Sequence, residues 1–486
     1  MLHRSAAGVR ISTLDIHGNP ATLYRPDDGA VGPVVVIAHG FAGSQQLMQS
    51  FALAFARNGY VAVTFDFPGH GRNAIPLTGS ITETDGATRT LVGELRAVAD
   101  AARPLGDGRL AVLGHSMATD IVVRFAQSTP RVGATIAVSL LSPVVTDRSP
   151  GNLLIIVGDW ETMLKREALR AVGLATLPAA AAPGVTYGDP ARGSGRRMAV
   201  SPHVEHVSVL YSEISLREAL AWLDAAFGVK RAVPPVIEGR GPWIMLLFGG
   251  IVLLAGIVSA FLPRVAAPGA GAGLGWSRIR PALLLPMIVT PLLLRIVPTH
   301  FLPVLVADYL AVHFAVYGLI TAACLAWTLR ASVPPGWGIE SNKAFLAATT
   351  AVVVFGFAAV VWPIDSFFTS FRPGPGRAPL MMSLLAGTLI FFLSDEWLTR
   401  GVGAARGAYA ASKAAFLMSL AAAVALDPAR LFFLVIIVPE IVLFFWVYGL
   451  FSAWTYRQTG HPFVAGLANA VAFAWAIGVT FPLLAG

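Results

Sequence analysis

The sequence is poor in cysteine and in charge. Its 486 residues contain one cysteine, Cys324, so no disulfide can form within the chain. Only 13% of the residues are charged and 55% are hydrophobic, and the mean hydropathy is +0.67. Soluble domains carry about 25% charged residues. This composition excludes a protein that is soluble along its whole length.

Several motifs are also missing. The sequence has no HExxH motif, no paired cysteines, no GxxxxGK loop and no dinucleotide fingerprint. We therefore expect neither a metal nor another cofactor. The net charge of +8 would point to nucleic acid only if the basic residues clustered, but they lie mostly between apolar runs. No nucleic-acid partner is expected.

The chain changes character near residue 240, before which most of the charge is concentrated. We divide it into a first domain at 1–229, a connector at 230–241 and a membrane domain at 242–486. A chain of this length is too long for one ordinary domain. Its beginning contains no apolar stretch long enough for a signal peptide.

The first domain alternates between strand and helix patterns. An antiparallel pair is expected at 9–25. It is followed by strands at 34–39, 61–67, 110–115, 134–141, 152–158 and 197–201, with helices at 46–58, 84–103, 117–127, 162–172 and 214–226. Continuous apolar strands that alternate with helices predict a mostly parallel sheet covered on both faces.

The strand at 110–115 runs into Gly114-His115-Ser116-Met117-Ala118 and then into a helix pattern. A serine flanked by small residues at a strand-to-helix turn is typical of a nucleophile elbow, because the tight turn has little room two positions before and after the serine. Ser116 is therefore the candidate nucleophile. Its hydroxyl needs a base within hydrogen-bond reach.

About residues 8–228 resemble the α/β-hydrolase superfamily. The resemblance rests on five motifs in order: His39–Gly43, Asp66–Gly71, Gly114–Ala118, an acidic turn after the strand 152–158, and Glu205–Leu210 before the last helix. It implies an α/β-hydrolase fold and a serine nucleophile, an acid and a histidine in that chain order. Only Ser142–Gly151 separates two of the strands where many relatives insert a helical cap, so no large cap is expected.

The resemblance leaves two candidates for the base and two for the acid. His206 is favoured over His203, because it lies a short loop before the last helix. Glu161 is favoured over Asp159, because in many relatives the acid stands three residues after the glycine that ends the strand, here Gly158.

The resemblance also implies that the backbone amides of Met117 and Phe41 stabilise the oxyanion. His39, Asp66 and His70 recur in family-like motifs, and we expect them to be structural.

The membrane domain contains eight apolar runs, near 242–262, 281–298, 301–329, 344–368, 379–399, 409–426, 430–454 and 462–485. Each is near the roughly 20 residues that cross a bilayer. Seven or eight spans are expected, because the proline-rich run 281–298 and the alanine-rich run 409–426 are weaker. This all-α bundle resembles no transporter family that we can name.

Titratable residues lie in or beside these runs: Arg295, Asp308, His313, Asp365, Asp395, Glu396 and Glu440. Such groups either line a substrate or proton pathway or pair between helices and at interfaces, and we favour the second interpretation.

The sequence predicts a multi-pass protein of a bacterial inner membrane. With eight spans and the first domain inside, most basic loops would lie outside, against the positive-inside tendency. A count of seven spans removes much of that conflict, so we expect the first domain on the cytoplasmic face.

The expected function is that of a membrane-embedded serine hydrolase. It would cleave an acyl ester, hydrophobic or lipid-like, by a Ser-His-Glu/Asp triad through an acyl-enzyme. Its partners would be that substrate and membrane lipids, and assembly into a homo-oligomer is left open. The alternatives are a transporter or sensor with an accessory hydrolase, and the same triad used as a peptidase, thioesterase or acyltransferase.

Overall fold

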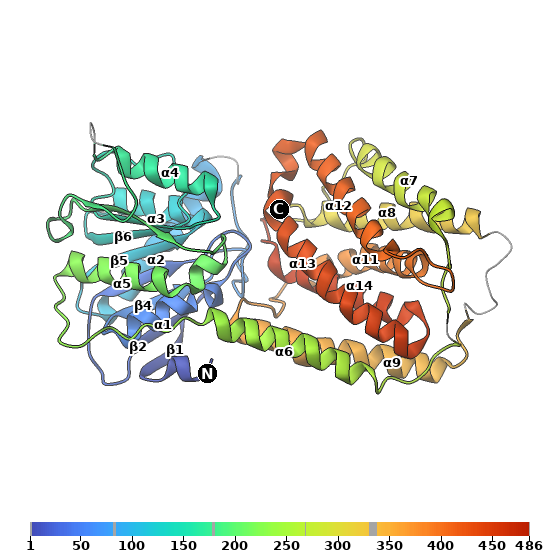
Figure 1. The fold of residues 1–486 in the computed structure, drawn as a ribbon. Helices are drawn as coiled ribbons and strands as arrows, with labels where there is room; N and C mark the ends of the chain where they lie inside the picture. Colours follow the sequence, from blue (N-terminus) through green and yellow to red (C-terminus); the bar gives the residue numbers. More distant parts are fainter. Residues whose placement is uncertain (1, 81–83, 177–179, 268, 330–337, 486) are drawn as a thin grey trace. The chain divides into compact units, whose positions relative to one another are not determined.

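The computed structural model describes residues 2–80, 84–176, 180–267, 269–329 and 338–485. It consists of two compact units (Figure 1). The first contains Met1–Leu246 and two short segments from much later in the chain, Ile364–Gly374 and Pro482–Ala485. The second contains the remaining residues after Leu246. The sequence placed the change of domain at 230–241, and it did not predict the two added segments.

The first unit is built on a nine-stranded sheet in the order β1-β2-β4-β3-β5-β6-β7-β9-β8. Neighbouring strands from β4 to β9 are parallel, whereas β1, β2 and β8 pair antiparallel with their neighbours. The strands are β1 (Val9–Ile16), β2 (Asn19–Pro26), β3 (Val34–Ala38), β4 (Val61–Phe65), β5 (Leu110–His115), β6 (Val132–Val138), β7 (Leu153–Gly158), β8 (Thr186–Tyr187) and β9 (Arg196–Ser201). The mostly parallel sheet predicted from the sequence is confirmed.

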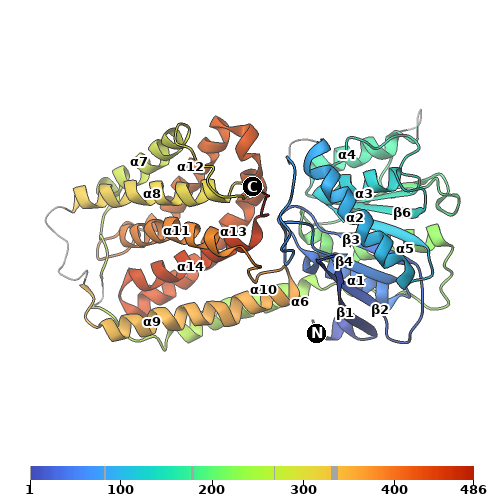
Figure 2. The ribbon, with the colours of Figure 1, turned by 180° about the vertical axis from the view of Figure 1, so that it is seen from behind.

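Helices cover both faces of this sheet (Figures 1 and 2). They are α1 (Gln49–Arg57), α2 (Arg89–Ala102), α3 (Met117–Gln127), α4 (Thr162–Gly173) and α5 (Glu213–Phe227). Val34, Val36 and Ala38 of β3 pack in one core with α2 and α3. Alternate side chains of a strand point to opposite faces, so both faces of a buried strand must be apolar. This explains the uninterrupted VVVIA of β3.

No helix lies between β6 and β7, so the first unit has no large cap at this position. After α5 the connector runs back along α1, where Asn58 exchanges two hydrogen bonds with the backbone of Val236, at 2.8 and 3.0 Å. The Arg57 guanidinium also pairs with the Glu238 carboxylate at 2.7 Å. The connector is therefore bound to the first unit.

From Gly241 onward the described residues contain eight helices, or near-continuous helical segments, that are long and apolar enough to cross a membrane, by length and composition. The start of the first and the end of the fourth belong to the first unit, and the rest belong to the second. These helices are α6 (Gly241–Ser259), α7 (Trp276–Leu294), α8 (Ala307–Thr328), α9 (Asn342–Phe355) continued through a π-helix into α10 (Trp362–Phe367), α11 (Ala378–Thr399), α12 (Ala408–Leu426), α13 (Pro428–Thr459) and α14 (Pro462–Thr480). The proline-rich run is one of these helices. The described part of the chain therefore contains eight candidate spans.

Glycines bring the central helices of this unit into close contact. A Cβ on Gly387 of α11 would lie 2.1 Å from the Ala311 carbonyl oxygen of α8. A Cβ on Gly318 of α8 would lie 2.6 Å from the Phe391 amide nitrogen of α11. Apolar helices gain no hydrophobic free energy by associating in lipid, so close backbone packing of this kind holds them together.

Candidate active site

Ser116 lies at the turn between β5 and α3, with φ +54° and ψ −119°. An L residue adopts a positive φ only at a cost of about 1–2 kcal/mol. A Cβ on Gly114 would lie 2.5 Å from the Ala118 carbonyl oxygen, so the turn closes only because Gly114 has no side chain. The local sequence therefore produces the predicted elbow and leaves Ser116 partly exposed at the carboxyl edge of the sheet.

His206 lies beside this serine. Its Nε2 is 2.9 Å from the Ser116 Oγ, and its Nδ1 is 2.6 Å from the Glu161 Oε1. Because a carboxylate oxygen only accepts, Nδ1 carries the proton and Nε2 accepts from the serine hydroxyl. Three residues from three separate loops thus form a continuous chain of hydrogen bonds from a buried carboxylate to a partly exposed hydroxyl.

Glu161 is held by contacts at its other carboxylate oxygen. Oε2 accepts from the Gly158 amide at 2.6 Å and from the Ser139 hydroxyl at 2.9 Å. Both donors stand at the ends of buried strands, β7 and β6. These two bonds leave Oε1 to face His206.

The alternatives that the sequence left open lie elsewhere. Asp159 is paired with Lys165 at 2.9 Å, and this hydrogen bond holds the pKa of the half-buried Asp159 carboxyl below its usual range. His203 is exposed. The structure brings neither of them into the hydrogen-bonded chain of Ser116, His206 and Glu161.

Two further residues of the site were not singled out from the sequence. Ser139, the donor to Glu161, has φ +60° at the end of β6, and nothing in its sequence context marks it. His115 donates from Nε2 to the His206 carbonyl oxygen at 3.0 Å, and the two rings lie 4.8 Å apart. The only feature of the sequence that could have pointed to His115 is its position directly before Ser116.

The loop after β3 contacts the elbow from the other side. A Cβ on Gly40 would lie 3.0 Å from the Ser116 Cβ and 3.1 Å from the His115 carbonyl oxygen. Phe41 follows directly, so its amide belongs to the segment packed against the nucleophile. Met117 is the first residue of α3, and the first amides of a helix lack partners within the helix. Both candidate oxyanion donors therefore belong to segments that adjoin Ser116.

His39 and Asp66 have structural contacts. The His39 Nε2 accepts from the Phe67 amide at 3.0 Å, and Asp66 accepts from the Gln45 amide at 2.7 Å and from the Arg72 amide at 3.0 Å. Both residues are fully buried. Their contacts join the loop after β3 to the loop after β4.

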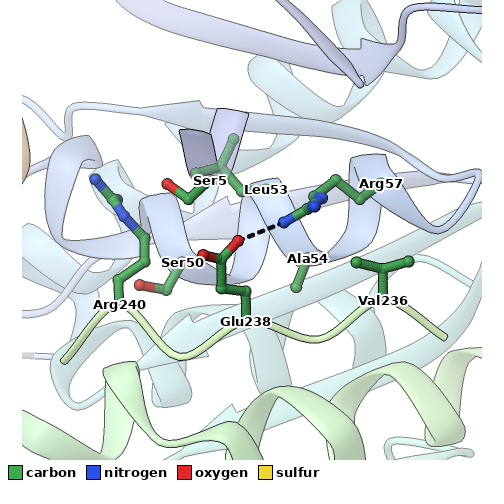
Figure 3. A pocket seen from close by; sticks show the side chains of 8 residues that line it. All are labelled: Ser5, Ser50, Leu53, Ala54, Arg57, Val236, Glu238 and Arg240. Atoms are coloured by element: carbon green, nitrogen blue, oxygen red, sulfur yellow. Dashed lines mark hydrogen bonds and ion pairs between the residues drawn. The ribbon is translucent and has the colours of Figure 1, made fainter. Parts of the chain in front are cut away.

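A small pocket is separate from this site (Figure 3). It lies where the connector crosses α1, and the pair of Arg57 and Glu238 is part of its lining. It contains none of the three residues of the hydrogen-bonded chain. Among the described residues, no group of three or more His, Cys, Asp and Glu side chains is arranged to hold a metal.

Residues 29–179 match the family model described as serine aminopeptidase, S33. The matched range contains the strand–elbow–helix unit, the loop after β3 and the acidic turn. The first unit has the α/β-hydrolase fold. Below we call it the hydrolase domain.

Solved structures resemble parts of the chain at low identity. TT1662 from Thermus thermophilus is 18% identical over 46% of this chain and 99% of its own, with a TM-score of 0.35. A membrane phospholipase A, described as a bacterial virulence factor, is 14% identical over 47% of this chain and 90% of its own, with a TM-score of 0.35. The epoxide hydrolase VrEH1 from Vigna radiata is 24% identical over 27% of this chain and 39% of its own, with a TM-score of 0.23. No curated protein sequence matches the chain.

Charged residues of the second unit pair with one another. Lys413 of α12 is bonded to Asp395 of α11, and Arg400 pairs with Glu396 at 3.2 Å. Four aromatic rings surround the Lys413 ammonium within 5.6 Å: Phe391, Phe392, Tyr409 and Phe445. The contact between Lys413 and Asp395 agrees with the interpretation of Asp395 as a member of an ion pair between helices, whereas Arg400 and Glu396 pair four residues apart at the end of α11.

The buried histidines of the hydrolase domain make its stability depend on pH. Burial lowers the pKa of His115 to about 3 and that of His39 to about 4. In the unfolded chain both have a pKa near 6.5, so below that pH the unfolded state binds more protons and the folded state loses stability. The loss approaches about 1.4 kcal/mol per pH unit for each histidine.

We therefore expect the apparent unfolding temperature of the purified protein to fall between pH 7 and pH 5, as measured by tryptophan fluorescence. The slope should be shallower in His115→Gln, which cannot take up this proton. An equal slope in the variant and the unsubstituted protein would contradict the assignment to His115.

Proposed function

We propose that this protein is a serine hydrolase that cleaves acyl esters through an acyl-enzyme. The observation that carries the proposal is the chain of hydrogen bonds from Glu161 through His206 to Ser116, at 2.6 and 2.9 Å. In this proposal His206 takes the proton of the Ser116 hydroxyl as its oxygen attacks the ester carbonyl carbon. Glu161 holds the imidazole in the correct tautomer and stabilises the imidazolium.

The amides of Phe41 and Met117 would donate to the oxyanion of the tetrahedral intermediate. The intermediate collapses by breaking the bond to the alcohol oxygen, which takes the proton from His206. Water then attacks the acyl-serine with the same base, releasing the acid and restoring Ser116. Each of the three residues has a role in both halves of the reaction.

The substrate that we propose is a hydrophobic or lipid-like ester. The supporting observation is the covalent attachment of the hydrolase domain to eight membrane-type helices. A water-soluble ester would not require such an attachment. The same triad also serves peptidases, thioesterases and acyltransferases, so amides and thioesters belong in the substrate panel.

The first test is whether Ser116 is the nucleophile. A fluorophosphonate probe should label the full-length protein but not Ser116→Ala, and the same change should abolish hydrolysis of p-nitrophenyl esters. Among esters, long acyl chains should be cleaved faster than acetate. If the amide or thioester substrates are the faster ones, the reaction class changes but the nucleophile stands; labelling that survives in Ser116→Ala would contradict the proposal.

The second test separates the triad members from their neighbours. Glu161→Gln and His206→Ala should each lower kcat by at least 100-fold, because triad residues act as a unit. The matched controls are Asp159→Asn and His203→Ala, which change the alternative acid and the alternative base outside the hydrogen-bonded chain. In these two variants kcat should change less than threefold. A larger loss in either control would transfer the role to that residue.

We further propose that the chain is a multi-pass protein of a bacterial inner membrane. The cytoplasmic placement expected above depended on a count of seven spans, whereas the structure has eight candidate helices. Ile364–Gly374 and Pro482–Ala485 belong to the same unit as the hydrolase fold. The chain should therefore return to the membrane face that carries the hydrolase domain after the fourth helix and again after the eighth. A return after the fourth helix needs an even number of crossings, so α7 would have to cross together with α6, α8 and α9.

With eight crossings, every second connection between helices lies on the membrane face opposite the hydrolase domain. These connections and the helix ends beside them carry most of the basic residues of the membrane domain: Arg264, Arg278, Arg280, Lys343, Arg400, Arg406 and Arg457. The positive-inside tendency places those connections in the cytoplasm. We therefore propose that the hydrolase domain lies on the outer face.

This orientation can be tested with single cysteines in a Cys324→Ala background. On intact cells stripped of the outer barrier, a membrane-impermeant maleimide should label Arg148→Cys of the hydrolase domain but not Arg406→Cys. After the membranes are opened, both should react. The reverse pattern would restore the cytoplasmic placement.

A further inference from the structure

Ile364–Gly374, which we call the strap, lies beside the loops that form the candidate active site. In the chain it comprises most of α10 and the residues after it, more than 100 residues beyond the hydrolase fold, yet it belongs to the same compact unit. Its polar contacts there fall on the loop after β3 and the loop after β4. Its Phe368 ring contacts the turn that follows His206, and its Phe367 ring contacts His3.

The strap is bonded to the loop after β3 through Ser44, three residues beyond Phe41. The Ser44 Oγ lies 2.9 Å from the Thr369 Oγ1 and accepts from the Ser370 amide at 2.8 Å. Ser44 is fully buried, and although it precedes a short helix it makes no capping hydrogen bond. The Ser44 hydroxyl therefore forms its hydrogen bonds with Thr369 and Ser370 of the strap.

A second bond reaches the loop after β4. The Arg72 guanidinium donates to the Asp365 Oδ2 at 2.9 Å, and Asp365 is buried. The other carboxylate oxygen, Oδ1, accepts from the strap's own amides, those of Phe371 and Arg372, at 3.0 and 3.3 Å. Asp365 thus accepts hydrogen bonds from within the strap and also binds Arg72 of the hydrolase domain.

Asp66 joins the two loops to which the strap is bonded. The buried Asp66 carboxylate accepts from the backbone amides of Gln45, next to Ser44, and of Arg72. A Cβ on Gly71 would lie 2.5 Å from that carboxyl group, and Gly71 has φ +53°, so the loop approaches this closely only with glycine there. The strap therefore binds both loops that Asp66 joins, and one of them, the loop after β3, contains Phe41.

Other parts of the chain support the same region. The Tyr211 ring, in the turn after His206, is stacked on the Phe368 ring of the strap at 5.9 Å. The last residues also bind the loop after β4, where the Leu483 amide donates to the Gly69 carbonyl at 3.0 Å and the Leu77 amide donates to the Leu483 carbonyl at 2.9 Å. Segments from the carboxyl-terminal half thus contact both sides of the loop that carries Asp66 and Arg72.

We propose that the strap is a positioning element of the active site. It holds the segment containing Phe41 against Ser116 through Ser44 and Arg72, so the geometry of the oxyanion donors depends on the end of the fourth membrane-type helix and the residues that follow it. The inference rests on the proposed serine hydrolase function. Ser44, Arg72 and Asp365 act through the loop and do not touch the reacting atoms. An oxyanion donor displaced by a fraction of an ångström stabilises the transition state less, with little change in substrate binding.

The test compares two arginines that pair with the same carboxylate. Arg72 links Asp365 to the loop after β4, whereas Arg372 pairs with Asp365 at 3.0 Å from within the strap. Their side chains are 47% and 61% exposed, so neither change opens a core. In the full-length protein, Arg72→Gln should lower the maximal rate of Ser116 labelling by a fluorophosphonate about tenfold, while the half-saturating probe concentration stays unchanged. Arg372→Gln should alter neither value by more than twofold.

Ser44→Ala tests the other attachment, and it should show the same selective loss of the maximal rate at an unchanged unfolding temperature. Asp365→Asn in the Arg72→Gln background should add no further loss, because the shared bond is already broken. For any ester that the protein cleaves, kcat should fall and KM should not.

The outcomes separate the two proposals. If the unsubstituted protein is labelled at Ser116 but Arg72→Gln and Ser44→Ala are labelled as fast, the strap inference is wrong and the hydrolase function stands. A loss that accompanies a lower unfolding temperature in both variants also overturns it, because the strap would then only stabilise the fold. If the unsubstituted protein is not labelled at Ser116, the proposed function fails and the strap inference falls with it.

Discussion

The strained turn at Ser116 is the constraint around which the hydrolase domain is arranged. A non-glycine residue with positive φ persists only where its surroundings over-determine it. Here β5 is paired on both sides by parallel strands, α3 starts at the next residue, and the Ser116 amide donates to the Val138 carbonyl at 2.9 Å. The central position of β5 in the sheet fixes the serine where three loops converge.

The other members of the site are fixed by the ends of neighbouring strands. Glu161 is oriented by a serine at the end of β6 and by the last amide of β7, so its position follows from sheet register. His206 has fewer contacts of its own, and its side chain is 35% exposed. The buried acid therefore orients a more exposed base, which suits an imidazole that has to exchange a proton with two different groups.

Polar contacts also organise the carboxyl-terminal half, but in two different ways. Within the helices, Asp395 with Lys413 and Glu396 with Arg400 satisfy one another, as buried charges must. At the strap, the Asp365 carboxylate turns outward to an arginine of the hydrolase domain. The pair of Asp395 and Lys413 joins two helices, and the contact of Asp365 joins a short segment of the second half of the sequence to the hydrolase domain.

The sequence by itself determined the order of the longer strands and helices, the elbow and the number of candidate spans to within one. These features depend on local patterns, namely the apolar runs of buried strands, the small residues at Gly114 and Ala118, and span length. Only the tertiary structure shows that Glu161 rather than Asp159, and His206 rather than His203, belong to the chain of hydrogen bonds, because this depends on which side chain reaches the next across 45 or 90 residues. The contributions of Ser139 and of the strap were also invisible in the sequence. A buried hydroxyl or a surface arginine carries no local signal, and its partner is set only when the chain has folded.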